Sequence, residues 1–272
     1  MKNVKTIAAI HSLCSIGNLA LTNIISILSI MGHQVCPIPT VIFSNLKSKN
    51  RKRVLIDNSR YIEECREQFK EDGIDFKIIV IGYLGSDDAI DGAARFANSY
   101  PSAITIIDSI FADDGEYLFD FDINYVNSLK QLLSVGDIII QNYTEACFLT
   151  GEEYKQEFNE WKIRKICYKL KKIGVKKVII TKVPAKRKSE IGIAIYEDGE
   201  FQIISKRKKE SSIQTRDMFV SVFIGYYLKG KGLKEAVIKA WEFICACINE
   251  SNKVQNNNSI SLEICLKRLS RL

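Results

Sequence analysis

Short apolar runs alternate with longer amphipathic runs up to about residue 181. Runs such as Thr6–Ile10 and Phe76–Ile81 are almost continuously apolar and rich in β-branched residues, which is typical of strands buried on both faces of a sheet. The segments between such runs space their apolar positions three or four residues apart, as amphipathic helices do. The alternation predicts an α/β fold with a mostly parallel sheet covered by helices.

The pattern also predicts where the elements lie. The predicted strands are Thr6–Ile10, Val35–Phe43, Phe76–Ile81, Ala103–Ile107, Asp137–Gln141 and Lys177–Thr181. The predicted helices cover about Asn18–Met31, Ser59–Glu71, Asp87–Asn98, Ile123–Leu133 and Lys155–Ile173, with a polar, basic excursion at Lys47–Asn58.

The pattern changes in the last third of the chain. Ile191–Tyr196 and Phe201–Ser205 flank an Asp-Gly pair, which predicts an antiparallel hairpin. Two further helices, about Thr215–Lys229 and Leu233–Glu250, should close the fold, since the Gly-Lys-Gly between them suits a turn. Gln255–Asn258 is expected to be an exposed loop.

Length and composition limit the protein class. The 272 residues are 46% hydrophobic, which is enough for one large domain over residues 1–272. No apolar run reaches the roughly 18 to 20 residues that span a bilayer, and Met1–Lys5 leads into a strand rather than a signal-peptide core, so we expect a cytoplasmic protein with no membrane partner. Eight scattered cysteines without a CxxC pair predict reduced core thiols.

The formal net charge of +7 is concentrated in short basic runs such as Lys47–Arg53, Lys186–Lys188 and Lys206–Lys209. These runs fit solvated surfaces or anionic ligands. Because no recognition motif or aromatic interleaving accompanies them, nucleic acid is not expected as a partner. A third interpretation, basic residues around a phosphate-binding mouth, depends on the motifs below.

Polar segments follow several of the predicted strands. They are His11–Asn18, Gly82–Ser86, Asp108–Gly115, Asn142–Glu145 and Thr181. Ligands of open α/β sheets collect beyond the carboxyl ends of the strands, so these segments predict one shared cleft.

Gln214–Asp217 leads into the predicted helix at Thr215. Backbone N–H groups at a helix N-terminus can bind a migrating phosphoryl group while a carboxylate orients the attacking hydroxyl, which makes Asp217 a candidate base for phosphoryl transfer. Glycine normally permits the close backbone approach to phosphate, and Gln214 and Arg216 stand where small residues are expected. Arg216 could contact phosphate or could block the site.

Asn142 and Glu145 lie three residues apart where a strand passes into a helix. The carboxylate would suit Mg²⁺, which prefers oxygen ligands. Helix capping by Asn142 or Thr144, with Glu145 in the first turn, is an equally good interpretation.

The order and residues of these segments resemble the ribokinase-like superfamily, and within it the pyridoxal and pyridoxamine kinases. The segments that carry the likeness are His11–Asn18, Pro37–Asn45, Gly82–Ser86, Asn142–Ala146 with Leu149–Gly151, and Gln214–Asp217. The likeness runs nearly from end to end. It implies a three-layer α/β/α sandwich with a mostly parallel central sheet and a small lid segment over about residues 46–58.

The resemblance also implies roles for individual residues. Asp217 corresponds to the catalytic base, and Gln214, Thr215 and Arg216 to an anion hole that reads Gly-Thr/Ala-Gly in the family. The implied substrate-binding residues are Ser12, Gly17, Thr40, Gly82 and Tyr83; the nucleotide-binding residues are Asp108, Asn142 and Thr181; the metal-binding residues are Asp113 and Glu145. Lys182 is a departure, since the family often has glycine there.

The implied activity is ATP-dependent phosphorylation of the 5′-hydroxymethyl group of pyridoxal, pyridoxamine or pyridoxine. ATP and Mg²⁺ are the implied cofactors, with a monovalent cation such as K⁺ as a further candidate, and a homodimer is the implied assembly. Two alternatives remain. One is a hydroxymethylpyrimidine kinase on the same scaffold, and the other is a catalytically impaired pseudokinase that binds a vitamer or nucleotide.

Overall fold

A computed structural model describes residues 4–17, 19–44, 54–119, 121–207, 215–254 and 262–270. The chain divides into two compact units, one of Met1–Asn58 with Lys209–Leu272 and one of Ser59–Lys208. Asn18, most of the predicted lid, Gln214 and the predicted loop Gln255–Asn258 lie outside the described residues.

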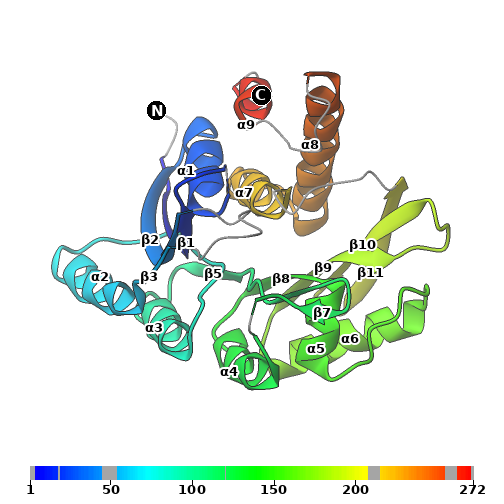
Figure 1. Cartoon of the computed structure of the whole chain (residues 1–272), viewed down its shortest axis with the longest axis horizontal. Helices are drawn as coiled ribbons and strands as arrows, with labels where there is room; N and C mark the ends of the chain where they lie inside the picture. Colours follow the sequence, from blue (N-terminus) through cyan, green and yellow to red (C-terminus); the bar gives the residue numbers. More distant parts are fainter. Residues whose placement is uncertain are drawn as a thin grey trace. The chain divides into compact units, whose positions relative to one another are not determined.

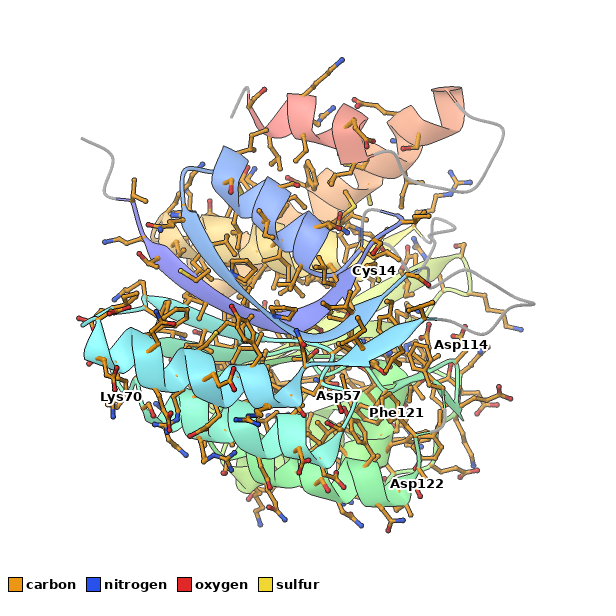
Figure 2. All side chains as sticks on the ribbon, turned by 60° about the vertical axis from the view of Figure 1, so that its left-hand side comes forward. Cys14, Asp57, Lys70, Asp114, Phe121 and Asp122 are labelled. Carbon is orange, nitrogen blue, oxygen red and sulfur yellow. The ribbon has the colours of Figure 1, made fainter. Side chains whose placement is uncertain are left out.

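The first unit contains two long parallel strands and the helices that cover them. β1 (Thr6–Cys14) pairs in parallel with β2 (Gln34–Phe43), and the short β3 (Leu55–Asp57) pairs antiparallel to β2. The helices are α1 (Leu21–Ile30), α7 (Thr215–Leu228), α8 (Leu233–Val254) and α9 (Leu262–Leu269). Helix α7 packs against both α1 and α8, and Figure 2 shows side chains filling the space between these helices and β1 and β2.

The second unit contains a parallel sheet that ends in an antiparallel hairpin. Its strands follow the order β4 (Ile78–Ile81), β5 (Ile104–Ile107), β8 (Ile138–Asn142), β9 (Lys177–Pro184), β10 (Glu190–Glu197) and β11 (Glu200–Arg207). Its helices are α2 (Ser59–Glu71), α3 (Asp87–Asn98), α4 (Ile123–Leu133), α5 (Tyr143–Thr150) and α6 (Glu160–Ile173), which lie on one side of the sheet (Figure 1). A separate hairpin joins β6 (Ala112–Asp113) to β7 (Glu116–Tyr117).

The predicted strands and helices are confirmed with shifts at their ends, but a third helix, α9, follows the two that were expected to close the fold, and β3 lies within the predicted polar excursion. The predicted bounds of α2, α3 and α4 agree with the structure, whereas β1 and β9 run several residues further than predicted. Asp122 caps the start of α4, where its carboxylate accepts the N–H groups of Asn124 and Tyr125 (Figure 2). The β10–β11 hairpin turns at Asp198 and Gly199, which have φ angles of 50° and 90° as a type I′ turn requires.

Two strand irregularities distort the sheet beside candidate functional residues. The pairing of β1 with β2 shifts between His11 and Leu13, so β2 has an extra residue beside Thr40. The pairing of β9 with β10 shifts in the same way around Lys182. Bulges of this kind change the direction of nearby side chains.

The eight cysteines are all free thiols, and six of them are buried, as predicted for a reduced core. Within the described part of the chain, the helices lack the length and apolar character needed to cross a membrane.

Candidate active site

In the first unit, Asp217 lies in the first turn of α7 and contacts the segment that joins β1 to α1. Its Oδ2 accepts the backbone N–H of Ala20 at 2.6 Å. Its Oδ1 lies 3.4 Å from Nε2 of His11, within ion-pair range but longer than a short hydrogen bond. Asp217 is only 6% exposed and His11 only 2%. The candidate base is therefore fixed by groups far from it in sequence.

The ring of His11 has a defined orientation. The N–H of Ser12 donates to Nδ1 of His11 at 2.8 Å, so Nδ1 is an acceptor and a neutral ring carries its proton on Nε2, toward Asp217. The Oγ of Ser12 lies 3.3 Å from the same nitrogen. The shift in register between His11 and Leu13 places this pair of residues at the distorted end of β1.

The environment of Asp217 favours its charged form. Burial alone would raise the pKa of Asp217, but the contact with His11, the Ala20 N–H and the charge of Arg216 together hold the pKa below its usual 3.8. A carboxyl group with a lowered pKa contributes stability above its ordinary pKa, and this is lost as the pH falls through the lower folded value. Asp217 is therefore ionised at neutral pH, as a proton acceptor must be.

The backbone around Asp217 is also unusual. Ala20 has φ 55° and ψ −128°, a conformation that costs a residue with a Cβ on the order of 1–3 kcal/mol. This conformation directs the Ala20 N–H at Asp217. Cys14 lies at the end of β1 (Figure 2), and burial together with the charge of Asp217 raises the pKa of its thiol to about 12.

The other predicted residues of this unit lie on neighbouring elements. Thr40 is fully buried beside the β2 irregularity, and Gly17 has φ 90°, which favours glycine. Thr215 and Arg216 form the start of α7 and are half-buried. The structure thus brings Ser12, His11 and Asp217 together, while the predicted ring-binding roles of Gly17 and Thr40 stay predictions.

In the second unit, Asn142 and Glu145 cap the start of α5. The side chain of Asn142 accepts the Glu145 N–H at 2.9 Å, and Oε2 of Glu145 accepts the Asn142 N–H at 2.9 Å. This reciprocal pair is a capping box, so the capping interpretation is confirmed. Glu145 is fully buried, and its Oε1 accepts the N–H of Phe111 at 3.3 Å.

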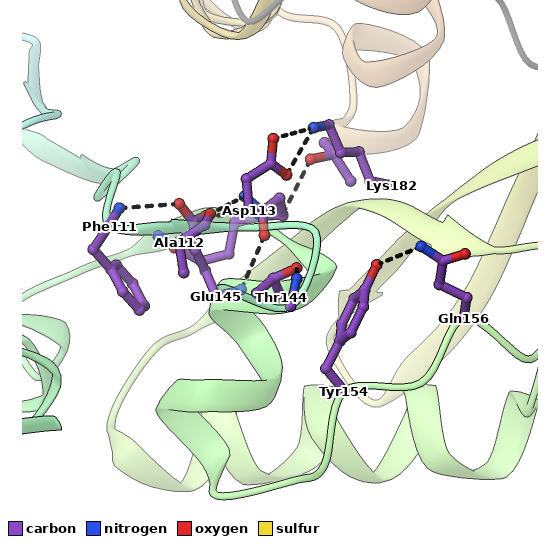
Figure 3. A network of polar contacts seen from close by, with 12 residues as sticks. Phe111, Ala112, Asp113, Thr144, Glu145, Tyr154, Gln156 and Lys182 are labelled. Atoms are coloured by element: carbon purple, nitrogen blue, oxygen red, sulfur yellow. Dashed lines mark hydrogen bonds and ion pairs between the residues drawn. The ribbon is translucent and has the colours of Figure 1, made fainter. Parts of the chain in front are cut away.

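The same helix start holds the β6–β7 hairpin in place (Figure 3). The amide of Asn142 donates to the Ala112 carbonyl at 2.7 Å, and Thr144 Oγ1 accepts the Gly115 N–H at 3.0 Å. A Cβ on Gly115 would lie 2.7 Å from the Tyr154 ring, and its φ of 87° also favours glycine. The first turn of α5 therefore fixes the position of the hairpin that carries Asp113.

Asp113 forms an ion pair with Lys182 across the end of the sheet (Figure 3). The Lys182 ammonium lies 2.8 Å and 2.7 Å from the two carboxylate oxygens. Lys182 has φ 57°, where a side chain costs about 1 kcal/mol or more, and glycine is the usual residue with this conformation in a bulge. The side chain of Lys182 is 44% exposed, and an exposed pair of this kind contributes about 0–1 kcal/mol. The pair therefore adds no clear net stability.

Asp113 and Glu145, implied as metal ligands by the resemblance, do not fit a direct Mg²⁺ site. Both oxygens of Glu145 accept backbone N–H groups, and the carboxylate of Asp113 is bound by Lys182. Among the described residues there is no group of three or more acidic, histidine or cysteine side chains that could hold a metal ion. Mg²⁺ is usually held by one or two carboxylates together with waters and substrate phosphates, and both candidate carboxylates already have other partners.

The remaining predicted residues lie on strand ends or in loops of the second unit. Asn142 and Thr181 are register partners on β8 and β9, and Asp108 is buried directly after β5. Tyr83 belongs to an aromatic cluster with Phe119 and Phe121, whose ring centroids lie 5.6 and 5.7 Å from its own. Gly82, which precedes Tyr83, is buried. Strand-end placement is confirmed for Asp108 and Asn142, whereas Thr181 lies inside β9, which continues to Pro184; the nucleotide contacts of all three stay predictions.

No role was predicted from the sequence for His11, Ala20 or Lys182. His11 could have been singled out as a polar residue inside the apolar run of β1. Lys182 stands out only as a departure from glycine. The role of Ala20 depends on its backbone, which leaves no side-chain signal.

The parallel α/β architecture and its polar strand ends place the chain in the ribokinase-like class of kinases. The chain belongs to the phosphomethylpyrimidine kinase family, whose model matches residues 26–261. A hydroxymethylpyrimidine/phosphomethylpyrimidine kinase of Aquifex aeolicus is 25% identical over 196 residues, which are 70% of this chain and 74% of the relative.

Solved structures share the whole fold. A protein of Bacteroides thetaiotaomicron, provisionally assigned as a phosphomethylpyrimidine kinase and also solved with pyridoxal, is 29% identical, with a TM-score of 0.91 over 99% of this chain and 95% of the other. Pyridoxal kinase from Lactobacillus plantarum is 22% identical, with a TM-score of 0.89 over 98% and 97% of the two chains. The chain is thus a kinase-type phosphotransferase by family.

Proposed function

We propose that the protein phosphorylates the hydroxymethyl group of a B6 vitamer, with pyridoxal as the first candidate and ATP as the donor. The observation that carries the proposal is the buried, ionised carboxylate of Asp217, which is held by His11 and the Ala20 N–H in the first turn of α7. A phosphoryl acceptor needs a fixed base beside its hydroxyl group. The resemblance to the pyridoxal kinases supports the choice of ring, as does the Bacteroides relative solved with pyridoxal.

In the proposed reaction, Asp217 accepts the proton of the hydroxymethyl group as its oxygen attacks the γ-phosphorus of ATP. The new O–P bond forms while the bond to the bridging oxygen breaks, so ADP leaves. Each carboxylate oxygen has two lone pairs, so the contacts with Ala20 and His11 leave acceptor capacity for the substrate. Arg216, one residue before Asp217, would add positive charge where the phosphoryl group passes.

The second unit would bind the nucleotide. Support comes from Asn142, the last residue of β8, and from Thr181, its partner on β9, because ligands of open α/β sheets collect at the carboxyl ends of the strands. A structural neighbour, pyridoxal kinase from Staphylococcus aureus, which is 17% identical, has been solved with ADP and with AMP-PCP.

Hydroxymethylpyrimidine is the second candidate substrate, because the Aquifex relative is named for that activity. The test is incubation of the purified protein with ATP and each ring in turn, with the product identified by mass. Phosphorylated pyridoxal supports the first candidate, and turnover of hydroxymethylpyrimidine alone supports the second. Binding of a ring without turnover of any would contradict both and support a pseudokinase.

A further inference from the structure

Neither strand pairing nor helix capping requires the backbone conformation of Lys182 or its contact with Asp113. Its backbone is left-handed inside a bulge of β9, and this conformation carries the side chain to Asp113 on the β6–β7 hairpin (Figure 3). The backbone cost described above is at least as large as the gain from an exposed ion pair. Stability therefore gives no reason for a lysine at this position.

The hairpin that carries Asp113 is held in place by several side-chain hydrogen bonds. Three side chains from the start of α5 hold its backbone: Asn142 at Ala112, Thr144 at Gly115 and Glu145 at Phe111. All three side chains are buried to within a few per cent, so the hairpin is fixed rather than loosely attached. Asp113 and Lys182 consequently meet in a predetermined geometry.

The Lys182 ammonium is also available to an anion. Its side chain is 44% exposed, against 21% for Asp113, so the cation faces solvent more than its partner does. An ammonium group has three donors, and the two carboxylate oxygens account for two of them. The residue before it, Thr181, pairs with Asn142 at the end of β8, the strand end where a nucleotide is proposed to bind.

We propose that Lys182 takes the place of a divalent cation at this strand end: its ammonium neutralises Asp113 and presents positive charge to the phosphates of a nucleotide. Lysine binds phosphate as a point charge, as a metal ion does, but without needing a set of oxygen ligands. The arrangement agrees with the poor fit of Asp113 and Glu145 to Mg²⁺. The inference rests on the proposed nucleotide binding.

The test is the affinity of the full-length protein for AMP-PCP, measured by calorimetry in EDTA and in Mg²⁺. Wild type should lose less than about tenfold in affinity when Mg²⁺ is removed. Lys182→Met, which keeps the length of the side chain, should lose about tenfold or more in EDTA, because the phosphates lose their cation. Lys182→Gly should do the same, and its folding is safeguarded because glycine suits the φ of 57°.

Lys176→Met is the matched control. Lys176 forms an ion pair of the same type in the same unit, with its ammonium 2.6 Å from Asp137, and its side chain is 74% exposed. This variant should bind AMP-PCP as wild type does in both buffers.

Two results would overturn the inference while leaving nucleotide binding intact. One is a loss of tenfold or more by wild type in EDTA, and the other is wild-type affinity of Lys182→Met in EDTA. Wild type that binds no AMP-PCP in either buffer would overturn the proposed nucleotide binding and this inference together.

Discussion

Asp217 and Glu145 occupy the same position of two helices, and they are used differently. Each is the third residue of its helix, α7 for Asp217 and α5 for Glu145. Glu145 bonds back to its own N-cap and to the adjacent hairpin, so both of its oxygens serve local structure. Asp217 contacts His11 and Ala20 on a distant segment. An acid in the first turn thus acquires its role from its partners and not from its position.

The largest expected effect is on catalysis by Asp217. Asp217→Asn keeps the shape and one acceptor oxygen but removes the base, so kcat should fall by about 10² or more while the Kd for substrate changes little. Steady-state kinetics of the proposed reaction, with substrate binding measured separately, would check this. Glu160→Gln, an exposed first-turn acid on α6, is the control and should leave kcat unchanged. Full activity of Asp217→Asn would remove Asp217 from the mechanism.

Substitution of Glu145 should have a large effect on stability, in contrast to the effect on catalysis expected at Asp217. Glu145→Ala leaves the buried N–H groups of Phe111 and Asn142 without their acceptor, so the free energy of unfolding should fall by about 2 kcal/mol or more. Urea denaturation would measure the loss. Asn159→Ala removes the exposed cap of α6 and should cost only about 1 kcal/mol. Equal losses in the two variants would show that the buried capping box is no more important than an ordinary cap.

A smaller effect on catalysis is expected at His11, because it acts on Asp217 and not on the substrate. His11→Asn removes a contact that lowers the pKa of Asp217, so the acid limb of the pH profile of kcat/KM should move to higher pH. Loss of orientation should also lower kcat by about tenfold, with a smaller change in KM. His33→Asn, at the chain's other histidine, is the control for the profile. An unchanged acid limb in His11→Asn would contradict a positioning role.

The smallest expected effect concerns His33 and the stability of the first unit. Burial, followed by the charges of Lys229 and Lys5, lowers the pKa of His33 from 6.5. The unfolded chain therefore binds a proton at a higher pH than the folded protein does, so stability should decline as the pH falls from 6.5 toward the folded value. His33→Asn should reduce this decline in urea midpoints measured at about pH 7.5 and pH 5.5. An identical decline in both proteins would assign the pH dependence to other groups.

The sheet and most helices could be predicted because their apolar periodicity is strong. The start of α5 was expected at Asn142–Glu145, but its extent was not predicted, since its residues are buried almost all round and show no amphipathic stripe. The two-residue strands β6 and β7 are too short to produce a pattern.

The site was predicted in part for the same reason. Asp217, Asn142 and Glu145 were found because their residue types and helix-start positions are visible in the sequence. The contact of Asp217 with Ala20 joins residues 197 positions apart, and the pairing of Lys182 with Asp113 depends on a bulge. Such contacts follow from packing and register, which local patterns do not encode.

The buried cysteine thiols can be used to measure local unfolding of the protein. Burial raises the pKa of Cys14 and Cys167 to about 12 and that of Cys147 to about 11, so few thiolates are available to an alkylating reagent at neutral pH. Cys14 belongs to the first unit and the other two to the second. Labelling of each thiol, read by mass along the chain, would therefore give separate opening rates for the two units without any engineered probe.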